Sequence, residues 1–384
     1  MHQNTDLLLK KHFFPNLNSL LLISKFEPMR KESKKFLREY LNANSPVGFE
    51  TPGQKVWLDY VKPYIDEYEV DTYGSVVGVI NPGHDYKVVI EAHADEIAWF
   101  VNYIDANGYI YVIRNGGSDH QIAPSMRVHL HTKKGKVDGI FGWPAIHVRD
   151  RAKEEQPSLK NLTIDVGAAN KKEVQAMGID VGTVVTFDAE MMELNKKYVV
   201  ARAIDNRGGG FMIAEVARLL KENKKKLPFT LYVVNAVQEE IGLRGAEMIS
   251  RRLKPNVAIV TDVTHDTQSP MYNKKIQGDT KCGGGPAVTT GPAVQNNLLN
   301  MIMDVAKKNK IDIQRQAVSR STGTDTDAFA YSDMGVASAL ISLPLKYMHT
   351  TVETVAYTDI EDCIQLMYET LCQLKAGHDF RYFK

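Results

Sequence analysis

The chain has 384 residues, 43% of them apolar, which is more than one hydrophobic core of about 250–300 residues holds, so we expect two domains. Its 47 basic and 46 acidic residues give a net charge of +1, which excludes a whole-chain field that attracts nucleic acid or an anionic membrane. No apolar run reaches the roughly 18 residues of a membrane span, and the three cysteines form no close pair. The composition therefore predicts a cytoplasmic protein without disulfides, nucleic-acid contacts or a membrane anchor.

The N-terminal part divides into an extension and two helices. Residues 1–30 contain a short apolar run but lack the long apolar core and the cleavage site of a signal peptide, so we interpret them as an N-terminal extension. Helical spacing of apolar residues follows over 31–44 and 51–66, with a Ser-Pro-Val-Gly break between them. Residues 68–79 then alternate as in a β-strand and lead to an Asn-Pro-Gly turn.

Four mostly apolar runs, which we interpret as buried strands, lead into histidines or acids. The side chains that follow them are His93 after residues 87–92, Glu239 and Glu240 after 231–237, Asp262 after 257–261, and His349 after 336–343. Because ligands of an open α/β sheet bind outside the carboxyl ends of its strands, we expect these side chains to meet at one edge. Imidazoles and carboxylates are ligands that Zn²⁺ and Co²⁺ accept, so the pattern predicts a divalent metal site.

Asp205 adds a further carboxylate at a loop-to-helix junction, before three glycines that lack the lysine and the spacing of a phosphate-binding loop. Adjacent residues of an extended strand point in opposite directions, so Glu239 and Glu240 share one site only if the strand has ended and the chain has turned. We predict that it has. His265 and Asp266 compete with Asp262 as a ligand, and we favour Asp262 because it follows the apolar run directly.

The sequence pattern changes over residues 98–192, where short β-like runs are separated by Gly, Asn and Asp. The runs cover 109–114, 127–132, 137–143 and 183–188, with one short helix at 171–177. Because helix and strand alternate again after this segment, we expect a small β-rich domain over 98–192, inserted into an α/β domain formed by 31–97 and 193–384. His129 and His131 share a strand face within it, and we expect structural roles for them because no acid lies beside them.

Separately, each of these acids and histidines is commonly a solvated surface group, but their order along the chain is specific. The motifs are His93-x-Asp95, Asp205-Asn-Arg207, Glu239-Glu240, Asp262, Gly323-Thr-Asp325 and His349-x-x-x-Glu353. This set resembles that of the tetrahedral, or glutamyl-type, aminopeptidases, over about residues 31–376. The resemblance implies an α/β fold: a mixed-sheet, zinc-peptidase-like catalytic domain with an inserted small β-barrel-like domain. One departure is Asn206, where the family commonly has Asp, and it affects only a supporting role.

The resemblance also implies a role for each residue. His93 and Asp262 would bind one metal ion, Glu240 and His349 the other, and Asp205 would bridge the two ions, most simply Zn²⁺ or Co²⁺. The ions would share a water that becomes hydroxide at neutral pH, with Glu239 as general base. Asp95 would accept the other N–H of the His93 imidazole and fix its orientation. Glu353 would brace the loop of His349, or else be an exposed acid at the start of a helix.

The function implied by this resemblance is a metallo-aminopeptidase that hydrolyses N-terminal residues from peptides, assembled through the insert as a hollow homo-oligomer, usually a tetrahedral dodecamer. A cellulase-type glycosidase with paired carboxylates and an amide deacylase on the same metal centre remain alternatives, as does, less favoured, a silent binding protein. For the substrate side chain we expect a pocket formed by loops 285–295 and 318–328. Its candidate charges are Arg315, Arg320, Asp325 and Asp327, which leave acidic, basic and apolar N-terminal residues all open.

Overall fold

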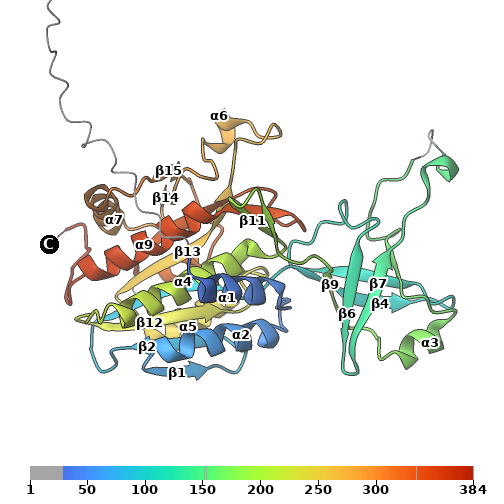
Figure 1. Cartoon of the computed structure of the whole chain (residues 1–384), viewed down its shortest axis with the longest axis horizontal. Helices are drawn as coiled ribbons and strands as arrows, with labels where there is room; N and C mark the ends of the chain where they lie inside the picture. The colour runs from blue at the N-terminus through green and yellow to red at the C-terminus, as the bar shows by residue number, and fades with distance from the viewer. Residues whose placement is uncertain (1–28, 151, 153, 334, 384) are drawn as a thin grey trace, which may run out of the picture.

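The computed structural model describes residues 29–150, 152, 154–333 and 335–383, so nearly all of the extension expected over 1–30 lies outside the described residues. Two lobes lie side by side, a large α/β lobe and a small β-barrel (Figure 1). The mixed sheet and the closed barrel confirm the expected fold class. Among the described helices, none combines the length and the apolar character needed to cross a membrane.

The α/β lobe begins with the two expected helices, α1 (Lys31–Asn42) and α2 (Thr51–Val61). A short 3-10 turn, η1 (Lys62–Tyr64), ends the second one earlier than we expected, because Pro63 has no N–H to continue the α-helix. The β-like stretch over 68–79 is a hairpin and not one strand. It comprises β1 (Glu67–Val70) and β2 (Val76–Ile80), joined by a turn in which one carboxylate oxygen of Asp71 accepts three backbone N–H groups.

The main sheet has eight strands in the order β1-β2-β12-β3-β13-β16-β14-β15. Its four central strands are parallel: β12 (Thr230–Ala236), β3 (Lys87–His93), β13 (Val257–His265) and β16 (Ala337–Leu345). At one edge, β14 (Ala287–Thr290) is antiparallel to β16 and parallel to β15 (Gln314–Ala317). The central strands are buried on both faces, which explains their almost continuous apolar runs.

Helices cover both faces of this sheet. On one side α4 (Ile204–Glu222), α7 (Asn296–Asn309) and α9 (Tyr357–Gln373) follow one another across the sheet, with α2 next to α4 over β2 and α1 packed on both α4 and α2. On the other side lie α5 (Arg244–Leu253) and the short α8 (Thr326–Ala330), while α6 (Lys274–Gln277) projects from the lobe (Figure 1). The glycines of α4 allow close packing, since a Cβ on Gly210 would lie 2.7 Å from the Tyr40 hydroxyl of α1.

The barrel closes in the order β4-β5-β8-β7-β6-β9. Its strands are β4 (Ala98–Ile104), β5 (Ile110–Asn115), β6 (Arg127–Thr132), β7 (Gly135–Phe141), β8 (Thr163–Asp165) and β9 (Val184–Phe187), with η2 (Ile146–Val148) and α3 (Lys171–Ala176) between them. Trp99 packs edge-on against Phe141 and Phe187 in its core. Because the chain enters the barrel directly after β3, this small domain lies next to the carboxyl edge of the main sheet.

Our expectation about His129 was wrong in one respect, because two acids lie beside it in space. Its Nδ1 is 2.9 Å from Asp138 of the neighbouring strand β7, and its Nε2 is 3.0 Å from Asp188. His131 instead lies 2.9 Å from the Thr186 hydroxyl of β9. The partners of both histidines are therefore Asp138, Asp188 and Thr186, and not the candidate ligands.

After the barrel, a small three-stranded sheet returns the chain to the main lobe. It consists of β10 (Met192–Leu194), β11 (Tyr198–Ala201) and β17 (Glu353–Ala356), paired antiparallel. The last residue of β11, Ala201, pairs with Glu353, the first residue of β17. This register brings Glu353 close to the start of α4, where Asp205 lies.

Candidate metal centre

Five of the predicted ligands gather in two groups that share Asp205. The ligand atoms of His93, Asp205 and Asp262 all lie within 4.8 Å of one another, and so do those of Asp205, Glu240 and His349. The Oδ1 atom of Asp205 is 3.3 Å from His93 Nε2, and its Oδ2 atom is 3.3 Å from His349 Nε2. One carboxylate thus presents one oxygen to each group, which is the geometry required of a bridging ligand.

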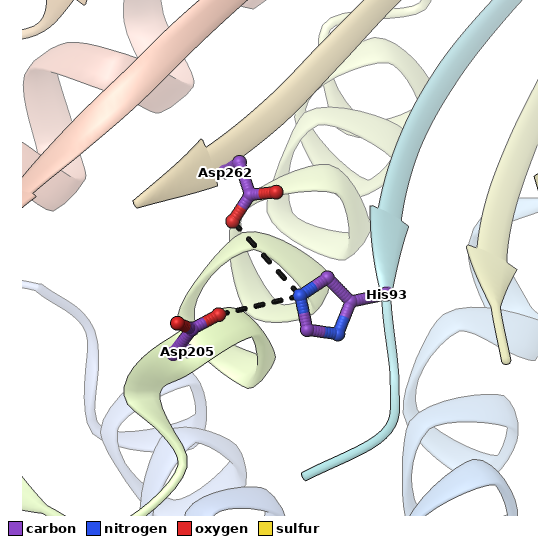
Figure 2. Close-up of side chains that lie close together, drawn as sticks. All are labelled: His93, Asp205 and Asp262. Carbon is purple, nitrogen blue, oxygen red and sulfur yellow. Dashed lines mark ion pairs between the residues drawn. The ribbon is translucent and has the colours of Figure 1, made fainter. Parts of the chain in front are cut away.

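Two neighbouring strands and the start of α4 deliver the first group, as Figure 2 shows: His93 ends β3, Asp262 lies on β13, and Asp205 lies at the start of α4, where its backbone is not yet helical. The strand β13 continues to His265, four residues beyond the end that we expected. Asp262 therefore lies within the strand, with its carboxylate Oδ1 3.9 Å from His93 Nε2. The parallel pairing of β3 and β13 makes this approach possible.

The second group depends on the turn that we predicted after β12. This strand ends at Ala236, and Gln238 has a φ of 59°, so the chain changes direction before the two glutamates. Glu240 Oε1 lies 3.3 Å from His349 Nε2, whereas Glu239 points toward the first group, with Oε2 3.7 Å from His93 Nε2. Glu239 belongs to neither group of candidate ligands, although it lies beside one of them.

Two buried carboxylates fix the backbone that carries these ligands. Asp95 accepts hydrogen bonds from the N–H groups of Glu239 and Glu240, each at 3.0 Å. Glu353 accepts from the N–H groups of Asp205 at 3.1 Å and His349 at 2.7 Å. Each of them therefore ties two site residues together by their main chains.

These contacts refine what we expected of Asp95 and Glu353. The Oδ1 atom of Asp95 is 3.4 Å from His93 Nδ1, but that nitrogen forms no hydrogen bond in the described part of the chain, so the expected imidazole bond is only a close approach. Glu353 is buried in a strand and is not an exposed acid at a helix start. It holds His349 in the left-handed region, at a φ of 60°, where non-glycine residues are uncommon.

The barrel lobe also touches the site. Gly117, in the loop after β5, lies against the ring of His349, since a Cβ at this position would be 2.7 Å from Nδ1. The neighbouring Gly116 packs in the same way on the side chain of Glu240. The second group of ligands therefore lies where the two lobes meet.

The electrostatics of the cluster favour bound cations. Burial and the neighbouring Asp205 raise the pKa of Glu240, and the same two causes raise that of Asp262 well above its ordinary range. Burial alone would lower the pKa of His349, but the carboxylates of Asp205 and Glu240 raise it to about 11. Several buried carboxylates this close together are costly without positive charge, and imidazole and carboxylate are donors that suit a divalent cation. The residues present therefore fit a metal pair.

The carboxyl group of Glu239 has a strongly raised pKa. Burial raises its pKa to about 10, with Asp262, Asp325 and Glu240 adding to the shift and His93 opposing it. A cation in the adjacent group would act against this shift and favour the carboxylate. The protonation of the Glu239 carboxyl should therefore change when metal binds.

Asp325 does not lie where we expected it. It is buried beside Glu91 of β3, two residues before His93, and burial raises the pKa of Glu91 to about 8. Sequence analysis missed Glu91, although an acid in the middle of a buried apolar strand is an unusual feature. The carboxylate oxygens of both residues have no hydrogen-bond partner among the described residues, and burial favours their protonated forms.

A cavity of about 260 Å³ opens onto the metal centre. Its lining comprises His93, Asp205, Glu239, Glu240, Asp262, Val263, Thr264, His265, Thr322, Gly323, Thr324, Met348 and His349. The loop 318–328 contributes to it as expected, but 285–295, Arg315 and Arg320 do not line it. His265 faces this cavity but belongs to neither ligand group. The carboxylate of Asp266 accepts hydrogen bonds from the backbone N–H groups of Gln268 and Cys282.

The Asn206 side chain faces the protein and has a structural role. Its amide Nδ2 donates to the carbonyl of Thr261 on β13 at 2.8 Å, and its Oδ1 accepts from Gly209 N at 3.0 Å. An aspartate could not donate the first of these bonds. The departure from the expected Asp therefore leaves the candidate ligands unchanged.

Two ligand groups that share a carboxylate, with a glutamate beside them that is not itself a ligand, are typical of hydrolases that use a pair of metal ions. The model of one such family, described as M42 glutamyl aminopeptidase, matches residues 74–366. The chain belongs to this family, which confirms both the resemblance stated above and the predicted class of enzyme, a peptide hydrolase.

Similar proteins support this assignment along most of the chain. A lysyl aminopeptidase of Pyrococcus furiosus is 32% identical, covering 88% of this chain and 96% of that protein. A TET aminopeptidase from a marine sediment thaumarchaeote has a TM-score of 0.86 at 27% identity, covering 90% and 98% of the two chains. A TET1 peptidase of Pyrococcus horikoshii, described as assembling into a tetrahedron or a large octahedral shell, has a TM-score of 0.79 at 26% identity, covering 89% and 100%.

Proposed function

We propose that this chain is a metal-dependent aminopeptidase that removes N-terminal residues from peptides with two divalent cations, Zn²⁺ or Co²⁺. The observation that carries the proposal is the position of Asp205, whose two oxygens each lie 3.3 Å from a different histidine. His93 and Asp262 would complete one cation site, and Glu240 and His349 the other. Bound there, two cations would lower the pKa of a water between them and polarise the scissile carbonyl.

Glu239 is the general base in this proposal. It lies beside the first ligand group without belonging to it, so its carboxylate can take a proton from the attacking water and deliver it to the leaving amine. Asp95 positions it through the backbone. The cavity of about 260 Å³ borders both ligand groups, so the end of a peptide can lie beside them.

A panel of aminoacyl-anilides tests this function. We expect hydrolysis of anilides with a free amino group, loss of that activity in a chelator, and recovery when Co²⁺ or Zn²⁺ is added back. A glycosidase with paired carboxylates needs no metal, so a chelator-resistant release of sugar from cellulose would favour that alternative. A deacylase would instead prefer substrates with a blocked amino group, and a silent binding protein would hydrolyse none of them.

Asp95→Asn should lower kcat/KM and metal affinity by about 10–100-fold, as replacements of groups that orient metal ligands do. The asparagine amide can accept only one of the two N–H groups of Glu239 and Glu240, and it turns a donor toward the other. Anilide kinetics and a chelator titration measure the two effects. Asp138→Asn, on the barrel surface, is the matched control, and equal values for the two variants would contradict the proposed role.

We also propose a homo-oligomer, a tetrahedral dodecamer, in which 98–192 is the oligomerisation domain inserted between 31–97 and 193–384. The shells of the Pyrococcus horikoshii relative support this. The outer face of the barrel supports it too, because it exposes Tyr103, Ile113 and Ile140 from three different strands. Three free thiols, Cys282, Cys363 and Cys372, are consistent with action in the reducing cytoplasm.

A further inference from the structure

The part of the cavity beyond the metal centre has a wall of its own. The wall is formed by Val263, Thr264 and His265 at the end of β13, by residues 322–324, and by Met348. A peptide whose first carbonyl lies at the metal centre must place its N-terminal side chain beside residues of this cavity. The chemistry of the wall therefore bears on which terminal residue is accepted.

Among the described residues that line the cavity, none is one of the four candidate charges named for the substrate pocket: Arg315, Arg320, Asp325 and Asp327. Asp327 is occupied by the backbone N–H groups of Thr322 and Gly323, at 3.0 to 3.2 Å, and so holds the loop together. Asp325 is buried beside Glu91 of β3 and does not line the cavity. Arg315 and Arg320 are exposed and do not line the cavity. The wall thus offers neither an acid for a lysine side chain nor a base for a glutamate.

The hydroxyl groups of the wall are already paired. Thr322 and Thr324 bond to each other at 2.9 Å, and Thr324 donates to Thr326 at 3.0 Å. The hydroxyl of Thr264 accepts from Gln316 Nε2 at 2.9 Å. An apolar substrate group would therefore leave no buried polar group of the wall unsatisfied, and the flexible thioether of Met348 can adapt to its shape.

His265 is the one ionisable side chain of the wall. Tyr272 holds it in place, with ring centroids 5.8 Å apart and the phenol oxygen 3.4 Å from Nδ1. Although His265 is an exposed residue, partial burial of its ring lowers its pKa, which favours the uncharged imidazole. It contributes a flat, uncharged surface to the cavity.

We propose that this wall receives an uncharged N-terminal side chain of the leucine or methionine kind, and that His265 is a specificity-determining residue. The proposal rests on the aminopeptidase function proposed above and adds the substrate class. It differs from the preference named for the Pyrococcus furiosus relative, which is for lysine. A charged side chain would lose its water without gaining a partner here, which disfavours its binding.

The test compares leucyl-, methionyl-, lysyl-, arginyl- and glutamyl-anilides with the metal-loaded enzyme. We expect kcat/KM for the leucyl or methionyl substrate to exceed those of the three charged ones at least about 10-fold, the scale on which pocket contacts discriminate. A lysyl, arginyl or glutamyl substrate as the best one would overturn the inference while leaving the aminopeptidase function intact. Hydrolysis of none of the five would instead remove the function, and the inference with it.

His265→Glu tests the assigned residue, because it places an acid in the wall. The ratio of lysyl to leucyl kcat/KM should rise at least about 10-fold, whereas the same replacement at the exposed His84 should leave it unchanged. An unchanged ratio in His265→Glu would overturn the role of His265. Inhibition of the wild-type enzyme by free leucine, lysine and glutamate gives the ranking without any variant, and stronger inhibition by lysine or glutamate than by leucine would contradict the proposal.

Discussion

Glu239→Gln should lower kcat by about 10²–10⁴-fold, the range that a general base contributes, and leave both cation sites able to bind metal. Gln keeps the shape of the side chain but cannot accept the proton of the attacking water. Because Glu239 lies in neither ligand group, its replacement removes no ligand. Stopped or continuous anilide assays measure the first effect, and metal content after dialysis measures the second.

The same variant should not lose stability in its metal-free form. Burial raises the pKa of Glu239 to about 10 in the folded chain, above its value of 4.5 when exposed. An acid with a raised folded-state pKa costs stability as the pH rises above its unfolded value, so a neutral Gln removes this cost at pH 7. Thermal unfolding in chelator checks this, with the exposed Glu190→Gln as control. Wild-type turnover in Glu239→Gln would eliminate the proposed mechanism.

Asp205→Asn is expected to reduce the metal content below two ions per chain and to lower kcat/KM by more than the about 100-fold that changes to supporting groups produce. The asparagine has one carbonyl oxygen, so it can serve only one of the two groups, and its amide presents hydrogens to the other. It also removes one of the negative charges that attract cations. Elemental analysis and anilide kinetics on the same preparation measure both quantities.

The matched control for this variant is Asp304→Asn, an exposed acid on α7. The backbone N–H of residue 205 still donates to Glu353 in the variant, so the main chain of the site should be preserved. Retention of two ions per chain with activity close to that of the control would show that Asp205 is not the shared ligand.

Most candidate ligands could be predicted from sequence because they lie on, or just after, strands of the main sheet. His93 and Asp262 follow from the rule that parallel strands deliver side chains to one edge, and Glu240 follows once the strand before it is known to end. The resemblance added Asp205, which lies on no strand, as the shared residue. These predictions needed local patterns and one general property of α/β sheets.

The supporting contacts could not be predicted in this way. Asp95 and Glu353 accept four hydrogen bonds from backbone N–H groups, and three of these bonds join residues more than about one hundred positions apart. Because a backbone N–H is present in almost every residue, the sequence does not indicate which one is bound. Whether a loop acid faces a cavity or the core is equally absent from local sequence. For this reason Asp325 was expected in the substrate pocket and lies instead against Glu91.

The most direct test of the account is an anomalous-difference map from crystals of the enzyme grown with Co²⁺. Two peaks about 3.5–4 Å apart are expected, as in other two-metal sites. One peak should lie among His93, Asp205 and Asp262, and the other among Asp205, Glu240 and His349. A single peak, or two peaks away from Asp205, would contradict the central claim that this aspartate joins a pair of catalytic cations.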